Sequence, residues 1–153
     1  MILSIDPGET TGLALRRDDG VVAFSMCRGK EQLWKLLEQL KKGDKVCIED
    51  FITAGRISKH GLYTTRLVGS VEALCWRYDL PLQRQVPSFR TAWLGRSVKF
   101  LEQTVGLDHE HRHEKDALAH LMAYEDWSSK LGHQEKQEFK RAIRCSNIEE
   151  LPG

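Results

Sequence analysis

Three acidic residues lie where an unpaired carboxylate is costly. Asp6 ends the first apolar segment and is followed at once by Pro7 and Gly8, so we expect it where a buried strand gives way to a turn. Glu49 ends another short apolar segment, and Asp116 lies among alanines. An ionised carboxylate in such a place must be paired, hydrogen-bonded or bound to a cation. A divalent metal ion fits if the acids converge, and for Asp6 simple capping of the turn is the alternative.

The first third of the chain predicts an antiparallel meander. Residues 1–6, 12–17 and 21–27 are short, mostly apolar segments of strand length. Asp18-Asp19-Gly20 separates the last two and contains the Asp-Gly pair that is typical of tight hairpins. We therefore expect three consecutive strands connected by turns.

Beyond this meander, helical and extended patterns alternate. Leucines recur with helical spacing over residues 30–42, with Gly43 as the expected end of the helix, and the strand 45–50 follows as a parallel crossover strand should. We further predict a helix over 62–78, a strand over 82–86, a short helix from Phe89 capped by Ser88, a helix over 113–127 and a charged helix over 134–144. The expected fold is α/β, with a mixed five-stranded sheet (a three-stranded antiparallel meander plus two parallel strands) flanked by helices.

Size and composition fit one globular domain. The chain has 153 residues, of which 41% are hydrophobic and 29% charged, and its formal net charge is +1. We expect one domain over 1–153, with a core of about 1–127 and a C-terminal helical extension over 128–153. The four cysteines are widely spaced, which predicts buried reduced thiols and a reducing compartment: Cys27, Cys47, Cys75 and Cys145. With neither a membrane-length apolar segment nor a signal peptide pattern, we expect a cytoplasmic protein.

The predicted elements can bring the three acids together. If the first and fourth strands are neighbours, Asp6 and Glu49 lie side by side at their ends, and a helix across the sheet can add Asp116. Such convergence would be strongly repulsive without cations. It is what two-metal phosphoryl transfer requires, with two divalent ions roughly 3.5 to 4 Å apart.

Three short motifs carry a resemblance to a known family. They are Ile5-Asp6-Pro7-Gly8-x-x-x-Gly12, Ile48-Glu49-x-Phe51 and His113-x-x-Asp116-Ala117-Leu118-Ala119. Over about residues 1–127 their order resembles that of the RuvC-type Holliday-junction resolvases of the RNase H-like, retroviral-integrase-like nuclease superfamily. The resemblance implies an RNase H-like fold and metal-dependent cleavage of branched DNA by a homodimer, for which the helix 62–78 is the candidate interface. It assigns Asp6, Glu49 and Asp116 as ligands of two Mg²⁺ or Mn²⁺ ions.

His113 departs from the family pattern, in which many members have a fourth acid. One helical turn before Asp116, it would lie on the same face, where it can ligate a metal, orient the attacking water or protonate a leaving group. His109 and His111 precede it at alternate positions, which raises the alternative of a separate zinc site. Because this spacing lacks the thiolates or helical pairing of common zinc sites, we favour a polar loop.

Two of the acids have competitors from the sequence alone. Asp50 can replace Glu49, because a shift of one residue moves a side chain to the other face of a strand. The spacing to Phe51 in the family motif favours Glu49. Asp116 can instead be a surface helix acid paired with His113 or His120.

Basic residues after the fourth strand predict a surface that contacts phosphates. Arg56, Lys59 and Arg66 lie in a segment that we expect to be largely a loop, and a solvated loop without that role is the alternative. Arg90 resembles the family's basic residues near the scissile phosphate. Phe51 can stack on an unpaired base or pack in the core.

Two other functions are consistent with parts of the sequence. Asp6-x-Gly8-x-Thr10-Thr11 also resembles the phosphate loop of actin-like sugar kinases, but those enzymes use two such domains and 153 residues supply one. A nuclease-derived module that binds junctions without cutting would keep the basic segment. The three acids favour the nuclease.

Overall fold

The protein is built on a mixed five-stranded sheet. The computed structural model describes residues 1–50, 58–104 and 112–130. The strands are β1 (Ile2–Asp6), β2 (Thr10–Arg16), β3 (Val22–Arg28), β4 (Lys45–Glu49) and β5 (Leu82–Gln85). Their order in the sheet is β3-β2-β1-β4-β5, with antiparallel pairing within the β1–β3 meander and parallel pairing of β4 with β1 and β5. The predicted α/β fold with this mixed sheet is confirmed.

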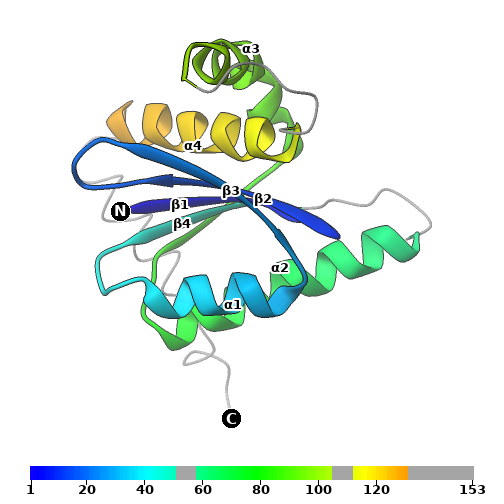
Figure 1. Cartoon of the computed structure of the whole chain (residues 1–153). Helices are drawn as coiled ribbons and strands as arrows, with labels where there is room; N and C mark the ends of the chain where they lie inside the picture. Colours follow the sequence, from blue (N-terminus) through cyan, green and yellow to red (C-terminus); the bar gives the residue numbers. More distant parts are fainter. Residues whose placement is uncertain (51–57, 105–111, 131–153) are drawn as a thin grey trace.

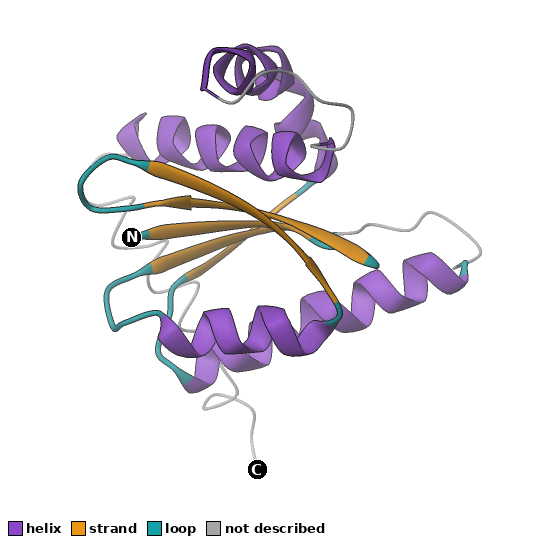
Figure 2. Cartoon of the chain, in the orientation of Figure 1, coloured by secondary structure: helices purple, strands orange, loops and turns teal. Residues whose placement is uncertain are grey.

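Helices cover both faces of the sheet (Figures 1 and 2). The helices α1 (Lys30–Gln39) and α2 (Lys59–Arg77) lie on one face. On the other face, α4 (Arg112–Lys130) lies across the strands, and α3 (Pro87–Thr104) packs on the outside of α4. The helix that carries Asp116 is thus the one in contact with the sheet.

Side chains along β1 and β4 alternate between the two faces of the sheet. The apolar core beneath α1 and α2 takes Leu3, Ile5, Val46 and Ile48, which are fully buried. Successive residues of a strand point to opposite faces, so Asp6 and Glu49 point toward α4 instead. The same alternation that builds the core therefore sends the strand-end acids to the opposite face.

A smaller apolar cluster holds α4 on its face of the sheet. It consists of Ala14, Leu101, Ala117, Leu118 and Leu121. Small side chains let the helix backbone approach the strands closely, and Gly12 of β2 lies directly against the backbone of α4. A Cβ at Gly12 would collide with the backbone carbonyl of His113 and would lie 2.8 Å from its Cβ.

Two predicted helix boundaries differ on the side of α1 and α2. The first helix ends at Gln39 rather than near Gly43, because Leu40 is extended and a turn follows, in which the Lys41 backbone N–H donates to Asp44. The second begins at Lys59 rather than Leu62. Its cap is Ser58, whose hydroxyl accepts from the Gly61 backbone N–H at 3.0 Å, so part of the expected basic loop is helix.

The prediction of a short helix capped by Ser88 was wrong. The helix α3 begins at Pro87, making Ser88 its second residue, and continues to Thr104. Proline suits a first helical position because its fixed φ is helical and the missing N–H has no partner there in any case. The helix predicted over 113–127 is confirmed as α4, which extends from Arg112 to Lys130.

The described cysteines are buried thiols, as predicted. Cys27, Cys47 and Cys75 are free and buried, and burial raises the pKa of Cys47 and Cys75 to about 12, which keeps both protonated. Cys145 and the predicted helix 134–144 lie outside the described residues. Among the described helices, none combines the length and apolar composition needed to cross a bilayer.

Candidate active site

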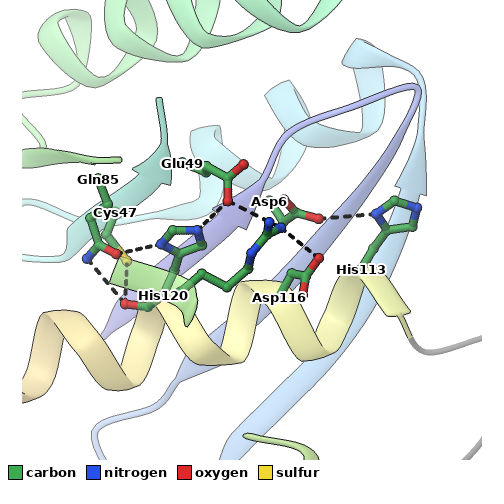
Figure 3. Close-up of polar contacts among 8 residues, drawn as sticks. Asp6, Cys47, Glu49, Gln85, His113, Asp116 and His120 are labelled. Carbon is green, nitrogen blue, oxygen red and sulfur yellow. Dashed lines mark hydrogen bonds and ion pairs between the residues drawn. The ribbon is translucent and has the colours of Figure 1, made fainter. Parts of the chain in front are cut away.

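Asp6, Glu49 and Asp116 meet at one end of the sheet (Figure 3). Parallel pairing places Ile5 beside Ile48, so the next residues, Asp6 and Glu49, end adjacent strands. The helix α4 supplies Asp116 from the face of the sheet that it covers, and the three residues are only 6%, 8% and 9% exposed. We call them the site carboxylates. Three elements distant in sequence thus deliver three buried acids to one place.

His113 contacts the first of these acids. Its Nδ1 lies 3.1 Å from Oδ2 of Asp6, across the gap between the start of α4 and the end of β1. Gly12, which pairs with Asp6 in the β1–β2 ladder, allows the close approach described above. The histidine at the expected position of a fourth acid therefore faces the site.

The protonation of Asp6 reflects its surroundings. Burial raises the pKa of Asp6 from its ordinary 3.8 to about 6, and the negative charges of Glu49 and Asp116 act in the same direction. The hydrogen bond with His113 opposes the rise. Burial is the main cause of the rise and the two neighbouring charges add to it, so a cation bound beside Asp6 would favour its ionised form.

One guanidinium bridges the other two acids. Nη1 of Arg90, from the first turn of α3, lies 2.9 Å from Oδ2 of Asp116 and 3.5 Å from Oε2 of Glu49. An arginine is a suitable counter-ion because its charge persists at any physiological pH. Arg90 thus lies within the site rather than on a peripheral surface.

The structure adds two functional candidates that the sequence did not indicate, His120 and Gln85. His120 is fully buried, with Nε2 at 2.6 Å from Oε2 of Glu49 and Nδ1 at 2.6 Å from Oε1 of Gln85. In the sequence, His120 appeared only as a helical neighbour of Asp116. Its i+4 spacing placed it on the right face of α4, but its partners come from β4 and β5, which no local pattern connects to it.

The structure decides between Glu49 and Asp50, and between a buried and a surface Asp116. Asp50 is partly exposed and lies 3.8 Å from Arg84, whereas Glu49 is the acid that faces α4. Asp116 is buried and its carboxylate contacts Arg90, so the alternative of a surface acid paired with His113 or His120 was wrong. Each histidine instead contacts a different carboxylate.

The donor set suits a hard divalent cation, although the side chains do not form a closed metal cage. Within residues 1–50, 58–104 and 112–130, no three Asp, Glu, His or Cys side chains lie close enough together to hold one ion. Arg90 lies between two of the site carboxylates in that arrangement. Carboxylate oxygens with an adjacent imidazole are nevertheless ligands that Mg²⁺ and Mn²⁺ accept.

The predicted DNA-contacting residues are placed in part. Lys59 and Arg66 are exposed on α2. The neighbour of Lys59, His60, contacts Glu9 of the β1–β2 turn through Nδ1 at 3.0 Å, which ties the start of α2 to the segment that follows Asp6. The remaining predicted residues, Phe51 and Arg56, lie outside the described residues, as do His109 and His111 of the zinc alternative.

The fold and the arrangement of acids define an RNase H-like α/β domain. No protein-family model matches the chain, and no curated protein matches its sequence. Comparison of structures does find neighbours.

Two of the structural neighbours are structures of the RuvC protein of Thermus thermophilus. A structure of T. thermophilus RuvC in complex with a Holliday junction substrate aligns with a TM-score of 0.60 and 14% identity, covering 84% of this chain and 94% of that one. Another T. thermophilus RuvC structure aligns with a TM-score of 0.59 and 15% identity, covering 84% and 95%. The resemblance to RuvC-type proteins that the motifs indicated is thus confirmed for the fold, which is RNase H-like.

Proposed function

We propose that the protein is a metal-dependent, structure-selective endonuclease that cleaves branched DNA such as Holliday junctions. The observation that carries the proposal is the convergence of three buried carboxylates from β1, β4 and α4 at one end of an RNase H-like sheet. The structural neighbour bound to a Holliday junction supports branched DNA as the substrate class.

We propose Asp6, Glu49 and Asp116 as ligands of two Mg²⁺ or Mn²⁺ ions, with His113 as a further ligand or as an acid–base group. The raised pKa of Asp6 is consistent with this assignment, because burial and the nearby charges of Glu49 and Asp116 disfavour its ionised form, which a bound cation would stabilise. Two such ions would activate a water molecule and stabilise the leaving oxygen of the phosphodiester.

The chain's own residues have distinct roles in this proposal. His113 holds Asp6 from the start of α4 and has a ring nitrogen left for water or a leaving group. Arg90 pairs with Asp116 and lies near Glu49 in the DNA-free protein, and it is close enough to the site to pair with the phosphate when DNA is bound. Both roles require the side chains to stay at the mouth of the site, where each is partly exposed.

Binding of DNA along α2 is the second part of the proposal. Lys59 and Arg66 are exposed, and His60, the neighbour of Lys59, contacts Glu9 of the turn that follows Asp6. These cations would contact phosphates rather than read bases. Arg56 and Phe51 remain predictions for the same surface.

We also propose a homodimer formed through α2. Its exposed side carries a stripe at helical spacing that consists of Leu62, Thr65, Gly69, Ala73 and Trp76. Leu62 and Trp76 are each 41% exposed, and a Cβ added at Gly69 would meet nothing within 4 Å. Small residues between two large apolar ones allow a second helix to approach closely.

Light scattering tests the proposed dimer. Leu62→Glu should convert it to a monomer, and a parent protein that is monomeric with and without DNA would refute the dimer proposal.

The experiment that tests the function is cleavage of a matched substrate panel. Four-way junctions, forks, flaps and linear duplexes of the same sequence are incubated with Mg²⁺, Mn²⁺ or EDTA, using the parent protein and Asp6→Asn. We expect metal-dependent cutting of branched substrates that Asp6→Asn abolishes while still binding them. Binding without cutting under every condition would favour a junction-binding module, and thermal stabilisation by ATP without cleavage would favour the kinase-like alternative.

A further inference from the structure

His120 lies on α4 one helical turn after Asp116, and both of its ring nitrogens have a contact. The side chain is fully buried, and its two contacts, with Glu49 and Gln85, are both 2.6 Å long. The residues form a line across three elements, from Gln85 at the end of β5 through His120 of α4 to Glu49 at the end of β4 (Figure 3). The imidazole therefore connects the ends of β4 and β5 through hydrogen bonds, and its role is more than apolar packing in the core.

The orientation of Gln85 fixes the direction of this line. Its Nε2 donates to Oε1 of Gln83 at 2.7 Å and to the His120 backbone carbonyl at 3.2 Å. Its Oε1 is consequently directed at the ring, so His120 Nδ1 must be the donor to it. The ring is thereby held in one orientation, with Nε2 directed at Glu49. Because an ionised carboxylate oxygen only accepts, this contact requires a proton between Nε2 and Oε2.

Glu49 receives a fixed position in return. Its Oε2 is taken by His120 at 2.6 Å, with Arg90 at 3.5 Å as a more distant partner. A glutamate has three side-chain torsions, and leaving them free would add an entropy cost to every binding event. Anchoring one oxygen in the interior leaves the other oxygen to serve the site.

We infer that His120, oriented by Gln85, is a positioning residue that presents Glu49 to the metal ions. The inference rests on the proposed function, since it needs Glu49 to be a ligand. Hydrogen-bonded partners behind a metal ligand characteristically change metal affinity by about 10- to 100-fold when they are removed. His120 itself touches neither metal nor DNA in this role.

Two substitutions separate the two ring contacts. His120→Gln places an amide donor near the position of Nε2 and can still reach Glu49. His120→Asn places its amide near Nδ1, where it can contact Gln85 but falls short of Glu49. Leu121→Ala is the matched control, because Leu121 is fully buried in the neighbouring position of α4 and belongs to the apolar cluster instead.

The readout is Mn²⁺ affinity of the DNA-free protein, measured by titration calorimetry at a temperature where circular dichroism shows each variant folded. We expect His120→Asn to weaken Mn²⁺ binding about 10- to 100-fold, with His120→Gln and Leu121→Ala retaining most of the parent affinity. If His120→Asn does not fold, Gln85→Met tests the same line from its other end and should also weaken binding.

Three results would overturn the inference alone, provided that the parent binds Mn²⁺. The first is an unchanged Mn²⁺ affinity in His120→Asn, or in Gln85→Met where that variant is used. The second is that His120→Gln weakens Mn²⁺ binding as much as His120→Asn does. The third is that Leu121→Ala weakens it as much as His120→Asn does. A parent protein that binds no Mn²⁺ would instead remove the metal site of the proposed function, and this inference with it.

Discussion

Gly12 lies directly against the backbone of His113, so closely that any side chain at position 12 would occupy the space of the His113 carbonyl. Gly12 is also the ladder partner of Asp6. Because position 12 has no side chain, the first turn of α4 can lie close to the end of β1. His113 reaches Asp6 because of this contact.

Gly12→Ala should displace the beginning of α4. Overpacking of this kind costs about 1–3 kcal/mol, and the shift would separate His113 from Asp6. We expect a lower denaturation midpoint in urea. We also expect metal-dependent cleavage to be lost under conditions where the variant is still folded.

Gly95→Ala is the control for this substitution. Gly95 lies within α3, and an added Cβ there would meet nothing within 4 Å. Alanine is favoured over glycine inside a helix by about 0.5–1 kcal/mol, so this variant should be as stable as the parent or more so. Equal behaviour of the two variants would contradict the proposed contact.

Asp6→Asn should stabilise the metal-free fold at neutral pH. Because the pKa of Asp6 is raised in the folded state to about 6, from 3.8, folding disfavours its ionised form, and stability falls as the pH rises from about 4 through 6. Removing the charge should recover about 1–3 kcal/mol at pH 7.5, the upper end corresponding to the full pKa shift. The gain should shrink toward pH 4.5.

Urea unfolding in EDTA at a series of pH values measures this difference. Added Mn²⁺ should reverse the ranking at pH 7.5, since a cation bound to the folded parent stabilises it and the variant has lost a ligand. A variant that is less stable than the parent at pH 7.5 without metal would contradict the prediction.

Arg90→Ala should separate metal binding from turnover. Its guanidinium contacts Glu49 and Asp116, so removing it relieves competition for those carboxylates and should tighten Mn²⁺ binding to the DNA-free protein. Cleavage should fall by about 10²-fold if Arg90 supports the charge that develops on the phosphate. Weaker Mn²⁺ binding would argue against competition.

Arg96→Ala is the matched control on the same helix. Arg96 is exposed, and its guanidinium lies 4.6 Å from the ring centroid of Trp93 rather than at the carboxylates. We expect Mn²⁺ affinity to match that of the parent. An equal effect of both substitutions would assign the change to the general charge of α3.

Lys59→Ala combined with Arg66→Ala should weaken junction binding and make it less sensitive to salt. Each phosphate contact that is lost should reduce the slope of log K against log salt by about 1. Fluorescence anisotropy at several salt concentrations gives this slope, and Mn²⁺ affinity should not change. Lys35→Ala combined with Lys41→Ala, at exposed positions in and just after α1, is the control of equal charge.

The parts of the fold that local patterns encode were predictable. Three local patterns each indicate a face that must be buried. They are the alternation in β1 and β4, the leucine spacing of α1 and the alanines around Asp116. The positions of Asp6, Glu49 and Asp116 followed, because strand ends and a helix face leave few ways to arrange them.

Contacts between distant elements could not be predicted in the same way. His120 gave no sign in the sequence of its contacts with Glu49 and Gln85, which arise from the register of α4 over β4 and β5. Arg90 was placed near a phosphate from the family pattern, but its ion pairs with the acids depend on α3 beginning at Pro87. Boundaries also shifted where a single capping residue, such as Ser58, decided them.

The site also carries a consequence for folding, because its contacts join residues far apart along the chain. His113 and Asp6 are separated by 107 positions, and His120 and Glu49 by 71. Contacts over such distances close large loops and tend to form late, after local helices and the hairpin. A ribosome-bound chain that has not yet released α4 lacks Asp116 and both histidines, so whatever chemistry the site performs is withheld until the domain is complete.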